Sequence, residues 1–228
     1  MDDLLRAAQT VLFDFDGPLC RLFAGHPAPA IAQRMRDLIT AHGEPAALGP
    51  EARQSGDPLV VLRALEPGGE LAVLLERALA DEELVAARTA LPTAYADRLV
   101  HTLAATGRRV AVTTNNAQEA VESYLHGRGL AHHFAGRVHG RLHDVSLLKP
   151  HPDCLRRALT ATRTRPERAV MIGDTVADLE AAAAAGVPFL GFAHGPVRRE
   201  ALRAAGARHV VSSLEEVLTA VTAAPSFR

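Results

Sequence analysis

Two pairs of aspartates stand where apolar runs of the chain end. Asp14 and Asp16 close the run TVLFDFDG, and Asp174 and Asp178 follow the run AVMIG. Carboxylates this close together repel one another unless a cation or a shared proton offsets their charge. A hard divalent cation such as Mg²⁺ prefers carboxylate oxygen. Asp178 taken alone could be a helix N-cap, but the two pairs together predict a Mg²⁺ site.

Two further segments add polar groups of complementary chemistry. Lys149 is the only lysine among 25 basic residues, in the segment LKP. Because all the other basic residues are arginines, the lysine indicates that a compact ammonium is needed at this position. Such a group can offset the charge of both a carboxylate and a phosphate. The segment Thr113-Thr114-Asn115-Asn116 offers hydroxyl, amide and backbone N–H groups to an anion. Acids, hydroxyl and lysine together suit Mg²⁺-assisted phosphoryl transfer to a carboxylate nucleophile.

These groups fall at the ends of predicted strands. Short apolar runs predict strands, and the segments between them predict helices of ordinary length. Alternation of this kind is typical of a parallel sheet covered on both faces, with all polar segments at one edge. The expected strands are 10–15, 109–114, 168–172, 187–192 and, weakly, 208–211; the expected helices are 92–106, 117–127, 152–162, 177–185, 197–205 and 213–222.

One stretch breaks the alternation. Residues 20–90 contain no convincing strand, and helical patterns lie near 28–42, 57–66 and 69–89, separated by Gly- and Pro-rich turns. A helical insertion after the first strand is expected to lie over the carboxyl ends of the strands, where ligands bind in open α/β sheets. We therefore expect a core of residues 1–19 and 91–228, and a helical cap of residues 20–90 that closes over the site.

Composition excludes several classes of partner. With 228 residues the chain is one large domain or one domain plus a small one, and a net charge of −1 leaves no basic excess for nucleic acid. No apolar run is long enough to span a membrane, and the acidic start MDDLLRAAQT does not resemble a signal peptide. Two cysteines, Cys20 and Cys154, cannot build a disulfide framework. We expect a cytoplasmic protein, either a monomer or a homodimer.

The order DFDG, VTTNN, LKP and GDTVAD resembles the haloacid dehalogenase (HAD) superfamily. The resemblance runs from about residue 10 to about residue 218, where ARHVVSSLEEVL resembles the last strand and helix of the family. It implies an α/β fold with a Rossmann-like, doubly wound parallel sheet and a small all-helical cap of the first insertion type. The phosphoglycolate phosphatase-like and β-phosphoglucomutase-like branch is the most similar.

The resemblance also implies roles for the residues that match these motifs. Asp14 would be the nucleophile, and Asp16 the general acid and then the general base. Thr114 would hydrogen-bond the phosphoryl group with the backbone N–H of Asn115, although Thr113 could fill the hydroxyl role. Lys149 would hold Asp14 and the phosphate in register. The Mg²⁺ ligands implied are Asp14, Asp16 through its backbone carbonyl, Asp174 and, directly or through another ligand, Asp178.

The implied activity is a Mg²⁺-dependent phosphatase that hydrolyses a small phosphorylated metabolite through an aspartyl-phosphate. A phosphosugar mutase of the same family is the alternative. A haloacid dehalogenase is disfavoured, because related dehalogenases lack the second acid, here Asp16. A phospho-accepting signalling domain is disfavoured by the acid pair at one strand end and by the cap. A non-catalytic binding protein is disfavoured because the acids and Lys149 are intact.

Other residues are less informative. Pro18 stands where the family usually has Thr, which removes an N–H and a hydroxyl from the loop. Arg21, at the junction with the insertion, could contact substrate or only solvent. Cys20 is better explained as a bystander thiol than as a nucleophile. The histidines between His132 and His143 fit solvated or capping groups better than zinc ligands. Arg198 and the neighbouring arginines are expected to be solvated helix surface.

Overall fold

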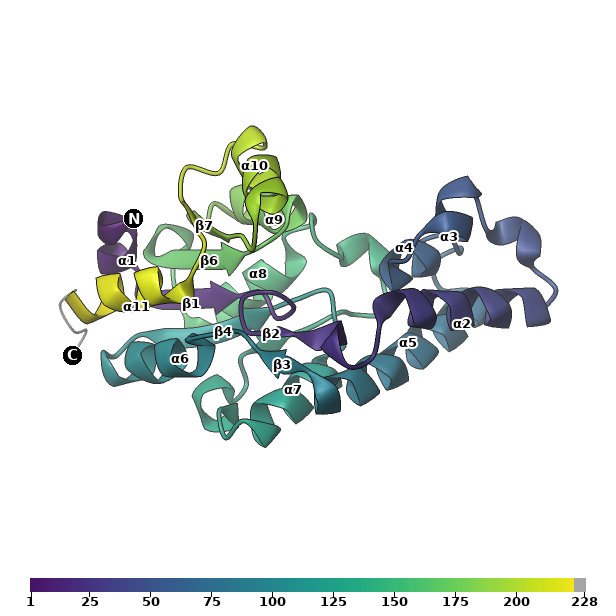
Figure 1. The fold of residues 1–228 in the computed structure, drawn as a ribbon, viewed down its shortest axis with the longest axis horizontal. Helices are drawn as coiled ribbons and strands as arrows, with labels where there is room; N and C mark the ends of the chain where they lie inside the picture. The colour runs from purple at the N-terminus through teal and green to yellow at the C-terminus, as the bar shows by residue number, and fades with distance from the viewer. Residues whose placement is uncertain (224–228) are drawn as a thin grey trace.

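A six-stranded parallel sheet forms the centre of the molecule in the computed structural model, which describes residues 1–223 (Figure 1). The strand order is β5-β4-β1-β6-β7-β8, and every neighbouring pair is parallel. This confirms the predicted Rossmann-like fold. The strands are β1 (Thr10–Phe13), β4 (Arg109–Thr113), β5 (Val138–His139), β6 (Ala169–Gly173), β7 (Phe189–Phe192) and β8 (Val210–Val211).

Alternate residues of each strand face opposite layers of helices. In β1, Val11 and Phe13 belong to one buried apolar cluster, whereas Leu12 between them belongs to another. The first cluster includes residues of α1 (Asp2–Ala7), α6 (Ala96–Ala105), α7 (Gln118–Gly127) and α11 (Leu214–Ala223); the second includes residues of α8 (Asp153–Thr162), α9 (Val176–Ala185) and α10 (Pro196–Ala204). Burial on both faces explains why the strand sequences are continuously apolar.

Part of the chain between β1 and β4 extends away from this sheet (Figure 1). It leaves through β2 (Cys20–Arg21) and returns through β3 (Leu91–Pro92), which pair antiparallel. Between them, residues 22–89, here called the helical segment, enclose a third apolar cluster of their own. Its helices are α2 (Ala28–Ala41), α3 (Pro50–Gln54), α4 (Pro58–Leu62) and α5 (Glu70–Thr89), with short 3-10 turns at Leu22–Ala24 and Pro45–Ala47.

The differences from the sequence-based elements are small and have local causes. β5 was not predicted, because its two residues lie in a stretch rich in Gly and His without an apolar run. β2 and β3 also have two residues each and pair with each other, so each is too short for a periodic pattern to identify it. The helix predicted from residue 92 begins only at Ala96, after β3 and a turn. Within residues 1–223, no helix is long and apolar enough to cross a membrane.

Candidate active site

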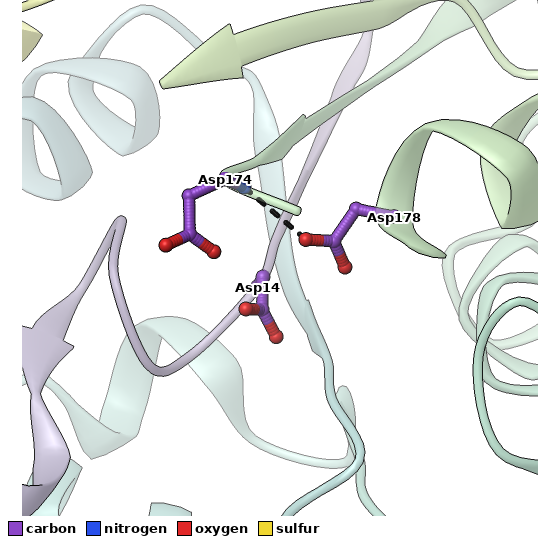
Figure 2. Close-up of side chains that lie close together, drawn as sticks. All are labelled: Asp14, Asp174 and Asp178. Carbon is purple, nitrogen blue, oxygen red and sulfur yellow. Dashed lines mark hydrogen bonds between the residues drawn. The ribbon is translucent and has the colours of Figure 1, made fainter. Parts of the chain in front are cut away.

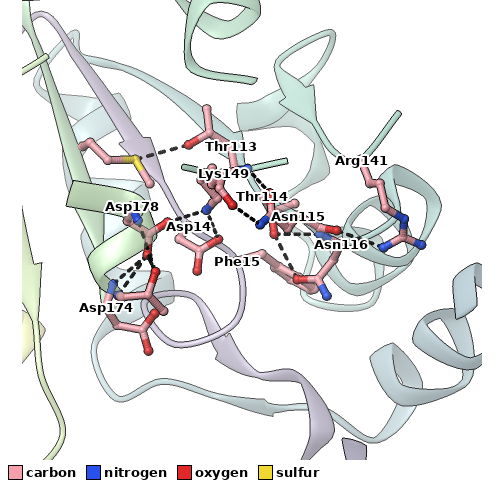
Figure 3. A network of polar contacts seen from close by, with 12 residues as sticks. Asp14, Phe15, Thr113, Thr114, Asn115, Asn116, Arg141, Lys149, Asp174 and Asp178 are labelled. Carbon is pink, nitrogen blue, oxygen red and sulfur yellow. Dashed lines mark hydrogen bonds and ion pairs between the residues drawn. The ribbon is translucent and has the colours of Figure 1, made fainter. Parts of the chain in front are cut away.

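Lys149 lies at the centre of the carboxyl edge of the sheet, almost fully buried (Figure 3). Its ammonium donates to Asp14 Oδ1 at 2.8 Å, to Asp178 Oδ1 at 2.5 Å and to the backbone oxygen of Thr113 at 3.0 Å. An ammonium has three N–H donors, so all of them are used by protein acceptors. The single lysine therefore holds together the ends of β1 and β4 and the start of α9.

Asp178 fixes the loop that follows β6. Its Oδ2 accepts hydrogen bonds from the backbone N–H groups of Asp174 and Thr175 and from the Thr175 hydroxyl. The Thr175 hydroxyl in return accepts from the Asp178 N–H, which completes a capping box at α9. Gly173 is required here, because a Cβ at this position would lie 2.5 Å from the Cβ of Asp178. With Lys149 on its other oxygen, Asp178 is saturated by protein donors.

Asp174 faces the Asp14 loop from the end of β6. Gly17 packs against it so closely that a Cβ would lie 2.5 Å from the Asp174 carboxyl carbon, and its φ of +125° independently favours glycine. Asp174 Oδ2 accepts from Arg198 of α10. Asp174 Oδ1 is buried and has no hydrogen-bond partner among the described residues. An unpartnered carboxylate oxygen in a buried position is suited to a cation.

Asp14, Asp174 and Asp178 converge from three segments (Figure 2). One carboxylate oxygen from each lies within 4.8 Å of the others, and this is the one such group of three or more metal-ligating side chains in residues 1–223. Burial, with the neighbouring carboxylates, raises the pKa of Asp174; burial raises the pKa of Asp14 as well, against the effect of Lys149. Burial opposes the charge of Lys149, but Asp14 and Asp178 outweigh it and raise its pKa.

Asp16 lies two residues beyond Asp14, on the loop between β1 and β2. Its Oδ1 accepts the Leu22 N–H at 2.8 Å, which aims the carboxyl from the loop toward the helical segment. Burial raises the pKa of Asp16, against the opposing effect of that N–H. The loop itself is closed by the Phe15 oxygen, which accepts from Leu19 and Cys20, so Pro18 removes no N–H that these bonds need.

Thr114 and Asn115 form the third polar wall. The Thr114 hydroxyl donates to Asn116 Oδ1 at 2.9 Å and faces the cavity described below, whereas the Thr113 hydroxyl is turned to Met171 in the sheet interior. Asn115 exchanges two hydrogen bonds with the backbone of Lys149, through its Oδ1 at 2.8 Å and its Nδ2 at 3.2 Å. Thr114 is thus placed for the hydroxyl role that the sequence left open between the two threonines.

A cavity of about 500 Å³ lies between these groups and the helical segment. From the core it is lined by Asp14, Asp16, Thr114, Asn115, Asn116, Lys149, Thr175, Ala177 and Asp178, and from the helical segment by Phe23, Ala28, Pro29, Gly56, Asp57, Pro58, Leu59 and Glu83. The acids, hydroxyl and lysine selected from the sequence therefore share one cavity, except Asp174, which lines a second one.

A buried ionic contact joins the helical segment to the core beside this cavity. Glu83 of α5 accepts from both Nη1 and Nη2 of Arg141, at 3.0 and 3.1 Å. Its two oxygens also accept from the Asn116 amide at 2.9 Å and from the Ala117 N–H at the start of α7, at 2.8 Å. Glu76 adds a further acceptor for Arg141. No motif in the sequence pointed to this contact, because its partners are far apart along the chain.

Other predicted residues lie elsewhere. Arg21 is exposed and lines the second cavity, with Asp16, Asp174 and Arg198, and not the cavity that contains Thr114 and Lys149. Arg198 is exposed on α10, as expected, and its guanidinium also binds Asp174, which the sequence did not predict. Arg198 is one of several arginines along α10, so nothing in the sequence indicated its pairing with Asp174.

In the sequence, the histidines between His132 and His143 and the thiol of Cys20 are also possible functional groups. His133 hydrogen-bonds His101 at 2.9 Å, His139 lies in β5, and His143 is exposed beside Glu76 at 3.3 Å. The rings of His132 and His133 pack against each other, but none of these histidines belongs to a group that could hold a metal within residues 1–223. Cys20 is buried as a free thiol, and burial raises its pKa strongly, so it does not supply a reactive thiolate.

Comparison with known proteins identifies the family of the chain. The sequence profile of the haloacid dehalogenase-like hydrolases matches residues 8–186. Phosphoglycolate phosphatase of Yersinia pseudotuberculosis is 29% identical over 237 residues, which cover 95% of this chain and 94% of that protein. Phosphoglycolate phosphatase of Rhodospirillum rubrum is 35% identical over 109 residues, 48% of this chain and 44% of that protein.

Solved structures share the fold. CbbY from Rhodobacter sphaeroides in complex with phosphate has a TM-score of 0.69 at 23% identity, covering 94% of this chain and 99% of that one. A predicted phosphatase from Clostridium acetobutylicum has a TM-score of 0.68 at 20% identity, with 94% and 98% covered. The resemblance inferred from the four motifs is confirmed, and the chain belongs to the haloacid dehalogenase-like hydrolase family.

Proposed function

We propose that the protein hydrolyses phosphate monoesters of small metabolites through an aspartyl-phosphate on Asp14, with Mg²⁺ as cofactor. The observation that carries the proposal is the position of Asp14: a buried carboxylate facing a cavity, held on one oxygen by Lys149 and flanked by further acids. Because related proteins are phosphatases, ester hydrolysis is the first reaction to expect. The groups around Asp14 can supply the proton and the positive charge that this reaction needs.

In the first step, Asp14 Oδ2 attacks phosphorus while the bond from phosphorus to the ester oxygen breaks. Lys149 holds the other oxygen of Asp14 and balances the charge of the transferred group, and the Thr114 hydroxyl lies beside the phosphoryl oxygens. Asp16 gives its proton to the leaving oxygen, so the alcohol departs neutral. The raised pKa of Asp16 favours the protonated form that this step requires.

In the second step, water attacks the phosphorus of the aspartyl-phosphate. Asp16, now a carboxylate, accepts the proton of that water, and the acyl phosphate bond breaks to release inorganic phosphate and free Asp14. The acid of the first step is the base of the second, so the cycle restores both groups. Asp16 also weighs against dehalogenation, because a halide leaves without a proton.

The residues present fit Mg²⁺. We assign Asp14 and Asp174 as carboxylate ligands, together with the backbone oxygen of Asp16, because Asp174 Oδ1 is buried and unpartnered. Asp178 is better suited to positioning, since Lys149 and the loop N–H groups already occupy both of its oxygens. When bound, the ion supplies positive charge next to Asp14 and the phosphoryl oxygens.

The test measures phosphate release from an aryl phosphate with and without Mg²⁺. We expect Mg²⁺-dependent release that falls at least about 10³-fold in Asp14→Asn, because the nucleophile is lost. Asp37→Asn, an exposed carboxylate on α2, is the matched control and is expected to keep full activity. Mass spectrometry of the quenched wild-type enzyme should detect one phosphoryl group on Asp14. Release that survives in Asp14→Asn would contradict the mechanism.

A further inference from the structure

The cavity differs in charge between its two sides. Among its lining residues the one cationic side chain is Lys149, and its three N–H groups are committed to Asp14, Asp178 and the Thr113 oxygen. That cation serves the phosphoryl end of a substrate. The wall formed by the helical segment contributes mostly apolar surface, from Phe23, Ala28, Pro29, Pro58 and Leu59.

The ionic groups on that wall are carboxylates. Glu83 is neutralised by Arg141 and accepts four hydrogen bonds, so it presents no free acceptor. Asp57 is exposed at the rim; its Oδ1 caps α4 by accepting the Leu59 N–H at 2.8 Å, and its negative charge has no ion-pair partner in the described chain. A second anion on a substrate would meet this charge.

The arginines of the helical segment all lie outside the cavity lining; they are Arg34, Arg36, Arg53, Arg63, Arg77 and Arg88. Arg34 and His26 pair with Glu82, Arg36 binds the backbone oxygens of Ala52 and Ser55, and Arg63 binds the backbone oxygen of Lys149. None of these side chains lines the cavity. A carboxylate or second phosphate placed against this wall would therefore lose water without gaining a counter-charge, which is costly.

We propose that the substrate is a phosphate monoester whose leaving alcohol carries no second negative charge, and that Asp57 enforces this by repelling anions. The inference rests on the proposed phosphatase function and deepens it. Related proteins are named phosphoglycolate phosphatase, and a CbbY structure holds xylulose-1,5-bisphosphate. Both of those molecules carry a second anionic group, so the proposal separates this chain from them by substrate charge.

Three esters that share a phosphate-oxygen-methylene unit provide the test: 2-phosphoglycolate, 2-hydroxyethyl phosphate and O-phosphoethanolamine, with a carboxylate, a hydroxyl and an ammonium at the far end. We expect kcat/KM for the hydroxyl and ammonium esters to exceed that for 2-phosphoglycolate at least tenfold. Asp57→Asn, which keeps the helix cap, should raise kcat/KM for 2-phosphoglycolate and lower it for O-phosphoethanolamine, each about threefold to tenfold. Glu51→Gln, an exposed carboxylate of α3 outside the cavity lining, should leave all three unchanged.

Binding to Asp14→Asn in the presence of Mg²⁺, measured by calorimetry, gives the same ranking without turnover. Equal or tighter binding of 2-phosphoglycolate than of 2-hydroxyethyl phosphate would overturn the inference, as would an Asp57→Asn variant that leaves the ranking unaltered. Failure of the phosphatase function is distinguishable, because the wild-type enzyme would then release no phosphate from the aryl phosphate or from any ester, while the binding order is still read directly.

Discussion

The two walls of the cavity are built in different ways. The core wall places Asp14, Asp16, Thr114, Lys149 and Asp178 at the carboxyl ends of strands, mostly buried and held by several hydrogen bonds each. The wall of the helical segment contributes apolar side chains from the turn after β2 and from the starts of α2 and α4. One wall supplies charge and proton transfer, and the other supplies shape.

The difference follows from how each wall is supported. Strand ends in a parallel sheet are fixed by neighbouring strands, so side chains there are positioned within the tight tolerances that chemistry needs. The helical segment packs around an apolar cluster of its own, which suits a lid that moves as one unit. Changes in the core wall should therefore affect kcat, and changes in the other wall should affect KM and selectivity.

After loss of the nucleophile, removal of the lysine should have the largest effect. We expect Lys149→Met to lower kcat about 10²–10³-fold, because the charge on Asp14 and the phosphoryl group loses its fixed counter-charge. The free energy of unfolding, measured with urea at pH 7, should fall by about 3–5 kcal/mol, because the buried carboxylates lose their cationic partner. Arg156→Met, an exposed cation of α8, serves as the control. An undiminished kcat in Lys149→Met would show that the core wall does not depend on this charge.

Two adjacent glutamates of α5 test the contact between the walls. Glu83 forms a buried pair with Arg141, whereas Glu82 forms a partly exposed pair with Arg34. We expect Glu83→Ala to cost about 3–5 kcal/mol of stability, because Arg141 stays buried with only Glu76 left as an ionic partner. Glu82→Ala should cost about 1 kcal/mol or less. Equal losses in urea titrations of the two variants would contradict the assigned importance of burial.

Acid titration tests a partly buried group of the core outside the site. Burial, with Arg157, lowers the pKa of His139 from 6.5 to about 4. The unfolded chain then binds more protons between pH 6.5 and 4, so stability should fall as the pH is lowered through that window. Between pH 6.5 and 4, the free energy of unfolding should fall by about 1–2 kcal/mol less in His139→Gln than in the wild type, as measured by urea titrations. The control is His126→Gln, at an exposed position of α7, which should show the same pH dependence of stability as the wild type. If His139→Gln also showed the wild-type pH dependence, His139 would not be the cause of the loss of stability in acid.

The smallest effect is expected on the wall of the helical segment. Leu59→Ala removes apolar surface from the cavity lining, so KM for a phosphate ester of an uncharged alcohol should rise about threefold to tenfold with kcat within about twofold. Val60→Ala is the matched control, because Val60 packs in the cluster of the helical segment and does not line the cavity. A drop in kcat without a change in KM would mean that this wall takes part in the chemistry.

Much of the core side was predictable from the sequence. Asp14, Asp16, Thr114, Lys149 and Asp178 were identified by type and by position after apolar runs, and the structure brings all five to one cavity. The prediction succeeds because a strand end is a local feature, and parallel topology then brings separate strand ends to one edge. The roles of these residues and the boundary of the cap at residues 20–90 remain predictions.

The sequence by itself determined most of the elements, the order of those strands along the chain and the set of groups available for catalysis, since each depends on neighbouring residues. Only the tertiary structure decided that Glu83 meets Arg141 across 58 positions, that Arg198 reaches Asp174, and that Asp57 stands at the cavity while Arg21 does not. Those pairings depend on how the helical segment and α10 pack against the sheet. Packing joins residues that no local pattern relates, and here it sets the charge that a substrate meets.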